Sequence, residues 1–174
     1  MWGVYKNLDT MMSTDPARTY DEFYRQELRP LVALAAAITG SHLAAEDIAQ
    51  EALIRAYKQW DVVSTYEKPG AWTRRVAINL ALSTTRRMAA DVRARLKLGA
   101  QPSLMPAAPQ HDPVWAAVRK LPGNQRAAVA LHYLEDRPVS EIAELLACSE
   151  STAKVHLHRG RTKLATLLEE EGRR

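Results

Sequence analysis

The chain has little of what would tie it to a disulfide scaffold, a metal site or a membrane. Its 174 residues include one cysteine, Cys148, so an internal disulfide is excluded. No cysteine or histidine pattern has the spacing of metal ligands. No apolar run approaches the roughly 18 residues of a membrane-spanning helix, and the first residues lack the apolar stretch of a signal peptide. The sequence therefore predicts a cytoplasmic protein with no metal and no cofactor.

Glycine and aromatic residues are also scarce. The chain has seven glycines and 6% aromatic residues, against a hydrophobic share of 47% that is enough for a buried core. Abundant Ala, Leu, Arg and Glu favour helix, and the low number of β-branched and aromatic residues disfavours sheet. We expect an all-α protein. The net charge of +4 and the pI near 9.3 favour a polyanionic partner without requiring one.

Helical periodicity runs through two blocks that a proline-rich stretch separates. The first block, residues 20–97, breaks near Gly40 and again near Pro69, which predicts at least three helices. Residues 98–113 contain four prolines and few charges, a composition typical of a linker. The second block covers residues 114–170. We therefore expect two small helical domains joined by a flexible linker, and a disordered leader at residues 1–19.

The second block contains two helices that a short polar turn connects. Residues 139–146 predict a helix that Ser140 can cap, with an inner stripe of Ile142, Leu145 and Leu146. A new cap at Ser149 or Ser151 starts the next helix. Two helices joined by a three- or four-residue turn indicate a helix-turn-helix motif.

The second of these helices has two different faces. At about 100° per residue, its inner face gathers Ala153, Leu157, Gly160 and Leu164, and Gly160 there would let another helix approach closely. The outer and flanking positions carry groups suited to base edges and phosphates, namely Ser151, Thr152, Lys154, Val155, His158 and Arg159. An ordinary surface helix with a solvated basic face fits the same geometry, so both interpretations stay open here.

Residues 41–60 form a second amphipathic helix. Its predicted inner face is Ala45, Ala49, Ala52, Leu53, Ala56, Tyr57 and Trp60. Its outer face includes Asp47, Gln50, Glu51 and Ile54. An exposed isoleucine among carboxylates favours a protein contact, although single exposed apolar residues are common and a solvated face explains the pattern equally well.

Residues 74–97 are strongly basic. Seven cations face one acid, Asp91, which is a local electrostatic footprint for nucleic acid. Trp72 and Tyr66 lie close in sequence, where aromatic rings could stack on unpaired bases. Trp72 is more simply explained as a core residue, whereas Tyr66, in a loop with Pro and Gly, is harder to place in a core.

Three stretches together resemble the extracytoplasmic-function (ECF) sigma factors of bacterial RNA polymerase, and most of all the actinobacterial SigE-type members. They are AAEDIAQEALIRAYKQW at residues 44–60, WTRRVAINLALSTTRR at residues 72–87, and the segment from LPGNQ to GRTKL at residues 121–164. The resemblance covers nearly everything from residue 20 to residue 168. It implies a sigma region 2 bundle at 20–97 and a sigma region 4 helix-turn-helix domain at 114–170.

The resemblance also implies partners and roles. Core RNA polymerase, through its β′ and β subunits, would meet Asp47, Gln50, Glu51 and Ile54. The −10 element and the melted non-template strand would meet Ser64, Thr65, Tyr66, Glu67, Arg74, Arg75, Asn79, Arg86 and Arg87. The −35 duplex would meet Ser151, Thr152, Lys154, Val155, His158 and Arg159. An anti-sigma factor is a further partner that the resemblance allows.

Two positions depart from the family pattern. Ser83 stands where many members have an acid, so the contacts that this acid supports are not carried over, and Glu150 replaces a common glycine. Lys154 and His158 stand at variable positions of the family pattern, so the promoter sequence cannot be copied from relatives. The implied function is a non-catalytic subunit for promoter-specific initiation and melting. The alternative is a helix-turn-helix repressor that acts without polymerase. A third class is an enzyme or an adaptor protein. An enzyme is disfavoured because no catalytic set of residues and no phosphate loop is present. An adaptor is disfavoured because it would gain nothing from the seven uncompensated cations of residues 74–97.

Overall fold

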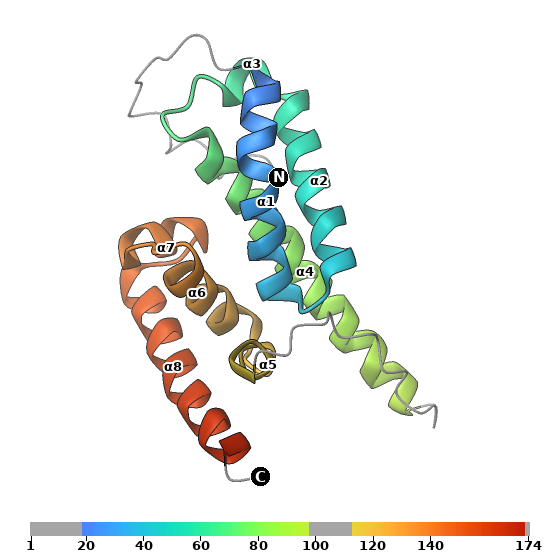
Figure 1. The fold of residues 1–174 in the computed structure, drawn as a ribbon, viewed down its shortest axis with the longest axis vertical. Helices are drawn as coiled ribbons and strands as arrows, with labels where there is room; N and C mark the ends of the chain where they lie inside the picture. The colour runs from blue at the N-terminus through green and yellow to red at the C-terminus, as the bar shows by residue number, and fades with distance from the viewer. Residues whose placement is uncertain (1–18, 98–112, 173–174) are drawn as a thin grey trace.

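The computed structural model describes residues 19–97 and 113–172, and every regular element in these ranges is an α-helix, as expected for an all-α protein (Figure 1). The predicted leader, apart from Thr19, and the predicted linker, apart from Pro113, lie outside the described residues. The helices are α1 (Tyr20–Thr39), α2 (His42–Lys58), α3 (Trp60–Val63), α4 (Pro69–Lys97), α5 (Pro113–Arg119), α6 (Gly123–Leu134), α7 (Val139–Leu145) and α8 (Glu150–Gly172).

Helices α1 and α2 form an antiparallel pair because local signals end one and start the other. Thr19 and Glu22 form a capping box at the start of α1, in which the backbone N–H of Glu22 donates to Thr19 Oγ1 at 3.4 Å. Gly40 ends α1 with a φ of 74°, a left-handed conformation that glycine adopts without strain. Ser41 then caps α2 by accepting from the backbone N–H of Ala44 at 3.3 Å.

Helix α4 completes the N-terminal bundle by packing across α1 and α2. The bundle core combines large side chains of α1 with alanines of α2 and α4, which let the helices approach closely; it includes Phe23, Leu31, Leu34, Ile38, Ala49, Ala52, Leu53, Ala77, Ile78 and Ala81. One inner-face prediction was wrong: Tyr57 is 63% exposed. Its ring lies at the bundle's end, with its centroid 4.8 Å from that of Tyr20.

Helices α6, α7 and α8 form the second bundle, with Leu121, Leu131 and Ile142 fully buried in its core. The expected cap at Ser140 was wrong. Pro138 occupies the N-cap position of α7 and makes no side-chain cap bond, because the side chain of proline has no hydrogen-bonding atom. At the start of α8, Ser149 Oγ accepts from the backbone N–H of Thr152 at 3.2 Å, which selects the first of the two predicted caps.

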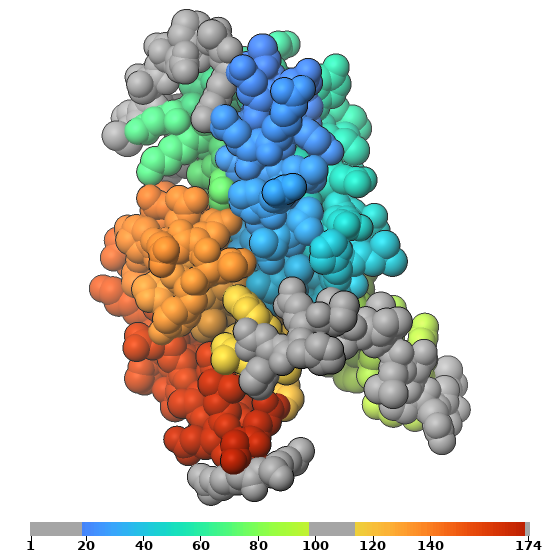
Figure 2. Space-filling model, viewed as in Figure 1, coloured from blue at the N-terminus to red at the C-terminus, as the bar shows by residue number. Residues whose placement is uncertain are grey.

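The two bundles pack directly against each other. Helix α1 contacts α5 and α6, helix α4 contacts α6 and α7, and the buried apolar residues of both halves form one cluster. Figure 2 shows the C-terminal half lying against the C-terminal part of α1. Arg126 of α6 donates to the carbonyl oxygen of Ile38 in α1 and, at 2.9 Å, to that of Leu121. Burial and the neighbouring charge of Arg119 lower the pKa of this guanidinium.

Gly160 allows α8 to approach α6 closely, as its place on the inner face predicted. A Cβ atom at this position would lie 2.8 Å from Cγ2 of Val129 and 3.3 Å from the carbonyl oxygen of Gln125. Both atoms belong to groups with little freedom to move. Gly172 lies in the same helix, and a Cβ there would meet nothing within 4 Å.

Replacing these two glycines tests the close packing of α8. Gly160→Ala should lower the free energy of unfolding by about 1 kcal/mol, because overpacking costs roughly 1 to 3 kcal/mol and alanine returns about 1 kcal/mol of helix propensity. Gly172→Ala should cause no loss. Urea unfolding of both variants measures the difference, and equal stability of the two would contradict the packing described for α6 and α8.

Candidate nucleic-acid interface

Helix α8 presents its predicted faces as two distinct surfaces. Ala153, Leu157 and Gly160 are buried, and Leu164 is half-buried against the core. The six residues of the predicted outer set are all exposed: Ser151, Thr152, Lys154, Val155, His158 and Arg159. We call this set the α8 face. It offers hydroxyls near the N-terminus of the helix, one apolar side chain and three cationic or ring-nitrogen groups, which is the mixture that base edges and phosphates accept.

The turn before α8 fixes the direction of the α8 face. Ala147 adopts a positive φ of 53°, and the backbone N–H of Cys148 donates to the carbonyl oxygen of Ala143 at 3.0 Å. Ser149 Oγ lies 2.8 Å from the hydroxyl oxygens of both Ser151 and Thr152.

Burial raises the pKa of the half-buried Cys148 thiol, so this cysteine remains a protonated packing residue rather than a reactive thiolate.

The outer side of α2 is a second exposed surface. Asp47, Gln50 and Ile54 are exposed, whereas Glu51 is half-buried and accepts from Nε of Arg55 at 2.8 Å. The structure adds Leu43, which is 73% exposed and lies one turn before Asp47. Leu43, Asp47 and Ile54 are four and seven residues apart in the sequence, which is the spacing of residues on one face of a helix. We call Leu43, Asp47, Gln50, Glu51 and Ile54 the α2 face.

The segment before α4 is partly folded onto the core. Thr65 and Glu67 are exposed, and Thr65 Oγ1 donates to the carbonyl oxygen of Val62 at 2.7 Å. Ser64 is half-buried. Tyr66 is half-buried and packs against the hydrophobic cluster, so its ring belongs to the core more than the sequence suggested. Trp72 also packs against the cluster, in agreement with its predicted core role.

Helix α4 places its cations on different sides. Arg75, Asn79 and Trp72 line a small pocket of about 170 Å³ together with Arg55 of α2. Asn79, Arg86 and Arg87 are exposed. Arg74 points elsewhere, toward α1 and the C-terminal bundle, because one residue along a helix turns the side chain by about 100°.

Arg74 is the centre of an ion-pair network between the two bundles. Its side chain is only 11% exposed, its Nη1 lies 2.7 Å from Oε2 of Glu27, and its Nε lies 3.0 Å from Oε2 of Glu135. In this conformation Arg74 is therefore held by two carboxylates and does not share a surface with the other predicted −10 residues.

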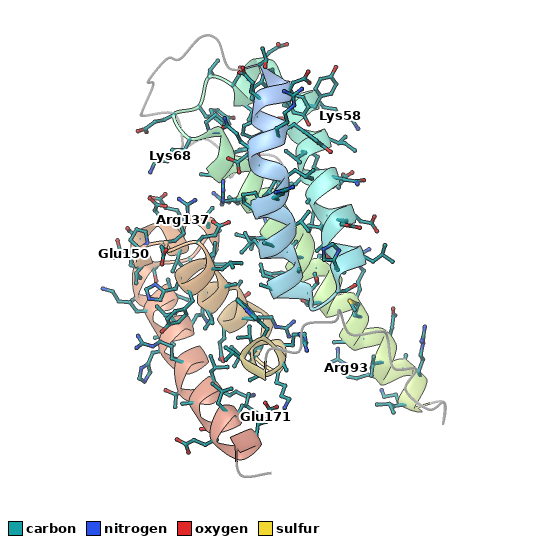
Figure 3. All side chains as sticks on the ribbon, in the orientation of Figure 1. Lys58, Lys68, Arg93, Arg137, Glu150 and Glu171 are labelled. Carbon is teal, nitrogen blue, oxygen red and sulfur yellow. The ribbon has the colours of Figure 1, made fainter. Side chains whose placement is uncertain are left out.

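Three further residues continue this network along the interface. Arg137 Nε lies 3.3 Å from Oε2 of Glu135, and Arg137 Nη1 lies 3.0 Å from Oε2 of Glu141. Lys68 Nζ lies 3.4 Å from Oε1 of Glu141, so the chain of charges returns to the N-terminal bundle (Figure 3). We call these six residues, Glu27, Lys68, Arg74, Glu135, Arg137 and Glu141, the Arg74 network.

The protonation of the outer pair matches this geometry. The hydrogen bond from Arg137, with smaller contributions from Lys68, lowers the pKa of Glu141. Burial opposes the charge of Arg137, but its bonds to Glu141 and Glu135 outweigh that cost and raise its pKa. Both groups are charged at neutral pH, so the network is ionic.

In the part of the chain that the structure describes, no cluster of three or more His, Cys, Asp or Glu side chains could hold a metal ion. No helix among the described residues is both long and apolar enough to cross a bilayer.

Comparison with protein families gives two matches in chain order. The model of sigma-70 region 2 matches residues 23–90, and that of sigma-70 region 4 matches residues 111–164. The first spans most of α1, all of α2 and α3, and most of α4. The second spans the C-terminal bundle up to the middle of α8 and includes the whole α8 face.

Several curated proteins are similar over most of the chain. The ECF RNA polymerase sigma factor SigE of Mycolicibacterium smegmatis is 31% identical over 86% of this chain, and the match spans 62% of that protein's length. The ECF sigma factor EcfG of Rhodopseudomonas palustris is 30% identical over 82% of this chain and 81% of its own length. Among solved structures, the sigma factor RpoE of Bartonella quintana, crystallised with the anti-sigma factor NepR, has the same fold, with a TM-score of 0.69 at 22% identity, covering 86% of this chain and 96% of that one.

Neutralising one carboxylate tests the Arg74 network. Glu135→Gln should lower the free energy of unfolding by about 1 to 3 kcal/mol, because it leaves the buried guanidinium of Arg74 with a weaker partner. Glu144→Gln makes the same change at an exposed position of α7 and should stay within about 0.5 kcal/mol of the unaltered protein. Urea unfolding gives both values, and hydrogen exchange should speed up across α6 and α7 only in Glu135→Gln. Indistinguishable variants would show that the network contributes nothing to joining the bundles.

Proposed function

The chain belongs to the ECF family of RNA polymerase sigma factors, the subunits that direct promoter-specific initiation of transcription, and we propose that it divides this function among three of its surfaces. The observation that carries the proposal is the α8 face, because α8 exposes all six predicted groove residues while its opposite side is buried. The proposed domains are residues 20–97 for region 2 and residues 114–170 for region 4.

The α8 face is proposed to read the −35 element in the major groove. A helix fits that groove, and its first turns carry the side chains that reach base edges. Val155 is 43% exposed and can meet a thymine methyl group. His158 and Arg159 supply donors for base edges, and Lys154 lies toward the side where phosphates run.

The exposed side of α4 and the preceding segment are proposed to hold the −10 element. Flipping a base out of a duplex costs a few kcal/mol, which stacking and charge contacts offset. The exposed groups available for this are Thr65, Glu67, Asn79, Arg86 and Arg87, with the half-buried Ser64, Tyr66 and Arg75 beside them. Arg74 is assigned to the Arg74 network instead, since its guanidinium already has two carboxylate partners.

The α2 face is proposed to bind core polymerase through β′, with β as a second contact of the whole protein. Leu43 and Ile54, 73% and 45% exposed, place apolar groups beside the polar Asp47 and Gln50. A mixed surface of this kind, with apolar groups set among polar ones, is typical of protein interfaces. The matches to sigma-70 regions 2 and 4 favour the sigma function over the repressor alternative.

Three further features follow from this proposal. The polymerase supplies the chemistry of RNA synthesis, so the chain itself is non-catalytic. It acts in the cytoplasm, where the polymerase and the chromosome are. The Bartonella relative was solved with an anti-sigma factor, and an anti-sigma factor is proposed as a partner here too.

Transcription with purified components tests the function. Bacterial core polymerase and sheared genomic DNA of the source organism should give transcripts with a small set of defined 5′ ends only when this chain is added. Sequencing of the 5′ ends is the measurement. The repressor alternative predicts specific duplex binding by the chain alone and the same transcripts in both reactions, and that outcome would overturn the proposal.

Core binding tests the α2 face separately. Asp47→Ala combined with Glu51→Ala should weaken affinity for core polymerase by about tenfold, or roughly 1.4 kcal/mol, because both acids belong to the proposed contact. Glu46→Ala removes an exposed acid from the neighbouring side of the same helix and should leave affinity unchanged. Fluorescence titration of labelled variants with core polymerase measures both, and equal affinities would move the contact away from this face.

A further inference from the structure

The last three turns of α4 extend beyond the packed body of the protein. Ala81 is the last fully buried residue of the helix, and every residue from 89 to 97 is exposed. Figure 1 shows this end of α4 projecting away from the other helices, and Figure 3 places Arg93 on it. From Arg86 to Lys97 the helix covers about 18 Å at 1.5 Å per residue.

The projecting end is not stabilised by packing against the other helices, because residues 89–97 are all exposed. Isolated helices of this length are marginal in water, and its large apolar side chains, Val92 and Leu96, are 48% and 54% exposed. Five cations face one acid, Asp91, between residues 86 and 97. Within the described ranges, none of these cations forms an ion pair. The segment therefore carries a concentrated positive charge with no structural role in the bundle.

Arg93 and Lys97 continue the side of α4 that carries Arg75, Asn79 and Arg86. At about 100° per residue, Arg75, Asn79, Arg86, Arg93 and Lys97 fall within about 40° of one another around the helix. We call these five residues the basic stripe. It runs for about 33 Å along α4, which is close to one helical turn of DNA, about 34 to 36 Å. Arg95 lies on the opposite side of the helix.

We propose that Arg93 and Lys97 extend the contact of α4 onto the phosphate backbone of duplex DNA adjoining the −10 element. The inference rests on the proposed function, because it assumes that Asn79 and Arg86 lie against the −10 region. Duplex DNA fits the stripe because the cations follow one line, whereas a protein partner would engage Val92 and Leu96 on the neighbouring side. Contacts of this kind set position and affinity without reading sequence.

Arg93→Ala and Arg95→Ala make a matched pair for the test. Both remove an exposed arginine from the same projecting end, two residues apart, and alanine is a better helix former in each case. The holoenzyme is assembled with core polymerase on a DNA fragment that the unaltered protein transcribes. Promoter-complex formation is then measured by fluorescence anisotropy between about 50 and 200 mM salt.

Arg93→Ala should reduce the slope of log affinity against log salt concentration by about one, the change expected when one phosphate contact is lost. Lys97→Ala should act in the same way. Arg93→Lys should retain the original slope, because a point charge is sufficient for a phosphate. Arg95→Ala should match the unaltered protein. Promoter preference should be unchanged in all four variants.

Three outcomes would overturn the inference. Equal slopes for Arg93→Ala and Arg95→Ala, with active unaltered holoenzyme, reject the stripe and leave the proposed function intact. Weaker core binding by Arg93→Ala at an unchanged salt slope assigns the projecting end to a protein partner. No transcription by the unaltered protein overturns the proposed function and this inference together.

Discussion

The guanidinium of Arg74, held between Glu27 and Glu135, is the interaction on which the arrangement of the two bundles depends. A charge that is 11% exposed is tolerated only when it is paired and hydrogen-bonded. Its two partners come from α1 and from the segment after α6, so satisfying one side chain fixes both bundles in one relative position. Arg137, Glu141 and Lys68 extend the same ionic contact toward solvent. The apolar cluster supplies contact area between the bundles, and the Arg74 network determines how the two bundles are aligned with each other.

This closed arrangement leaves the α2 face and the α8 face open. In Figure 1, α2 and α8 lie on opposite sides of the molecule, and the interface is formed by α1, α4, α5, α6 and α7. The beginning of α4 differs, because Lys68 and Arg74 both bond to carboxylates of the C-terminal bundle. Helix α4 thus has near its start a cation, Arg74, that is paired within the protein, and at its end cations that face solvent.

Sequence patterns predicted what depends on one helix at a time. The two faces of α8 and the close approach at Gly160 follow from helical periodicity, and the structure confirms both. Contacts between distant segments could not be predicted in this way. Glu135 lies 61 positions from Arg74, and no local sequence pattern indicates that the two side chains meet. Tyr57 was misplaced for a related reason. The end of a bundle exposes inner-face positions that periodicity alone assigns to the core.

The position of each cation around α4 therefore says more about nucleic-acid binding than the net charge of +4 or the count of seven basic residues in residues 74–97. Arg74 contributes fully to that count, yet its charge is compensated by two acids within the protein. Arg86, Arg93 and Lys97 are exposed on a common side, where their fields add instead of being cancelled. Because a phosphate backbone responds to local potential, the proposed DNA contact along α4 depends on which side of the helix each exposed cation occupies. The count of seven basic residues overstates the charge available for that contact.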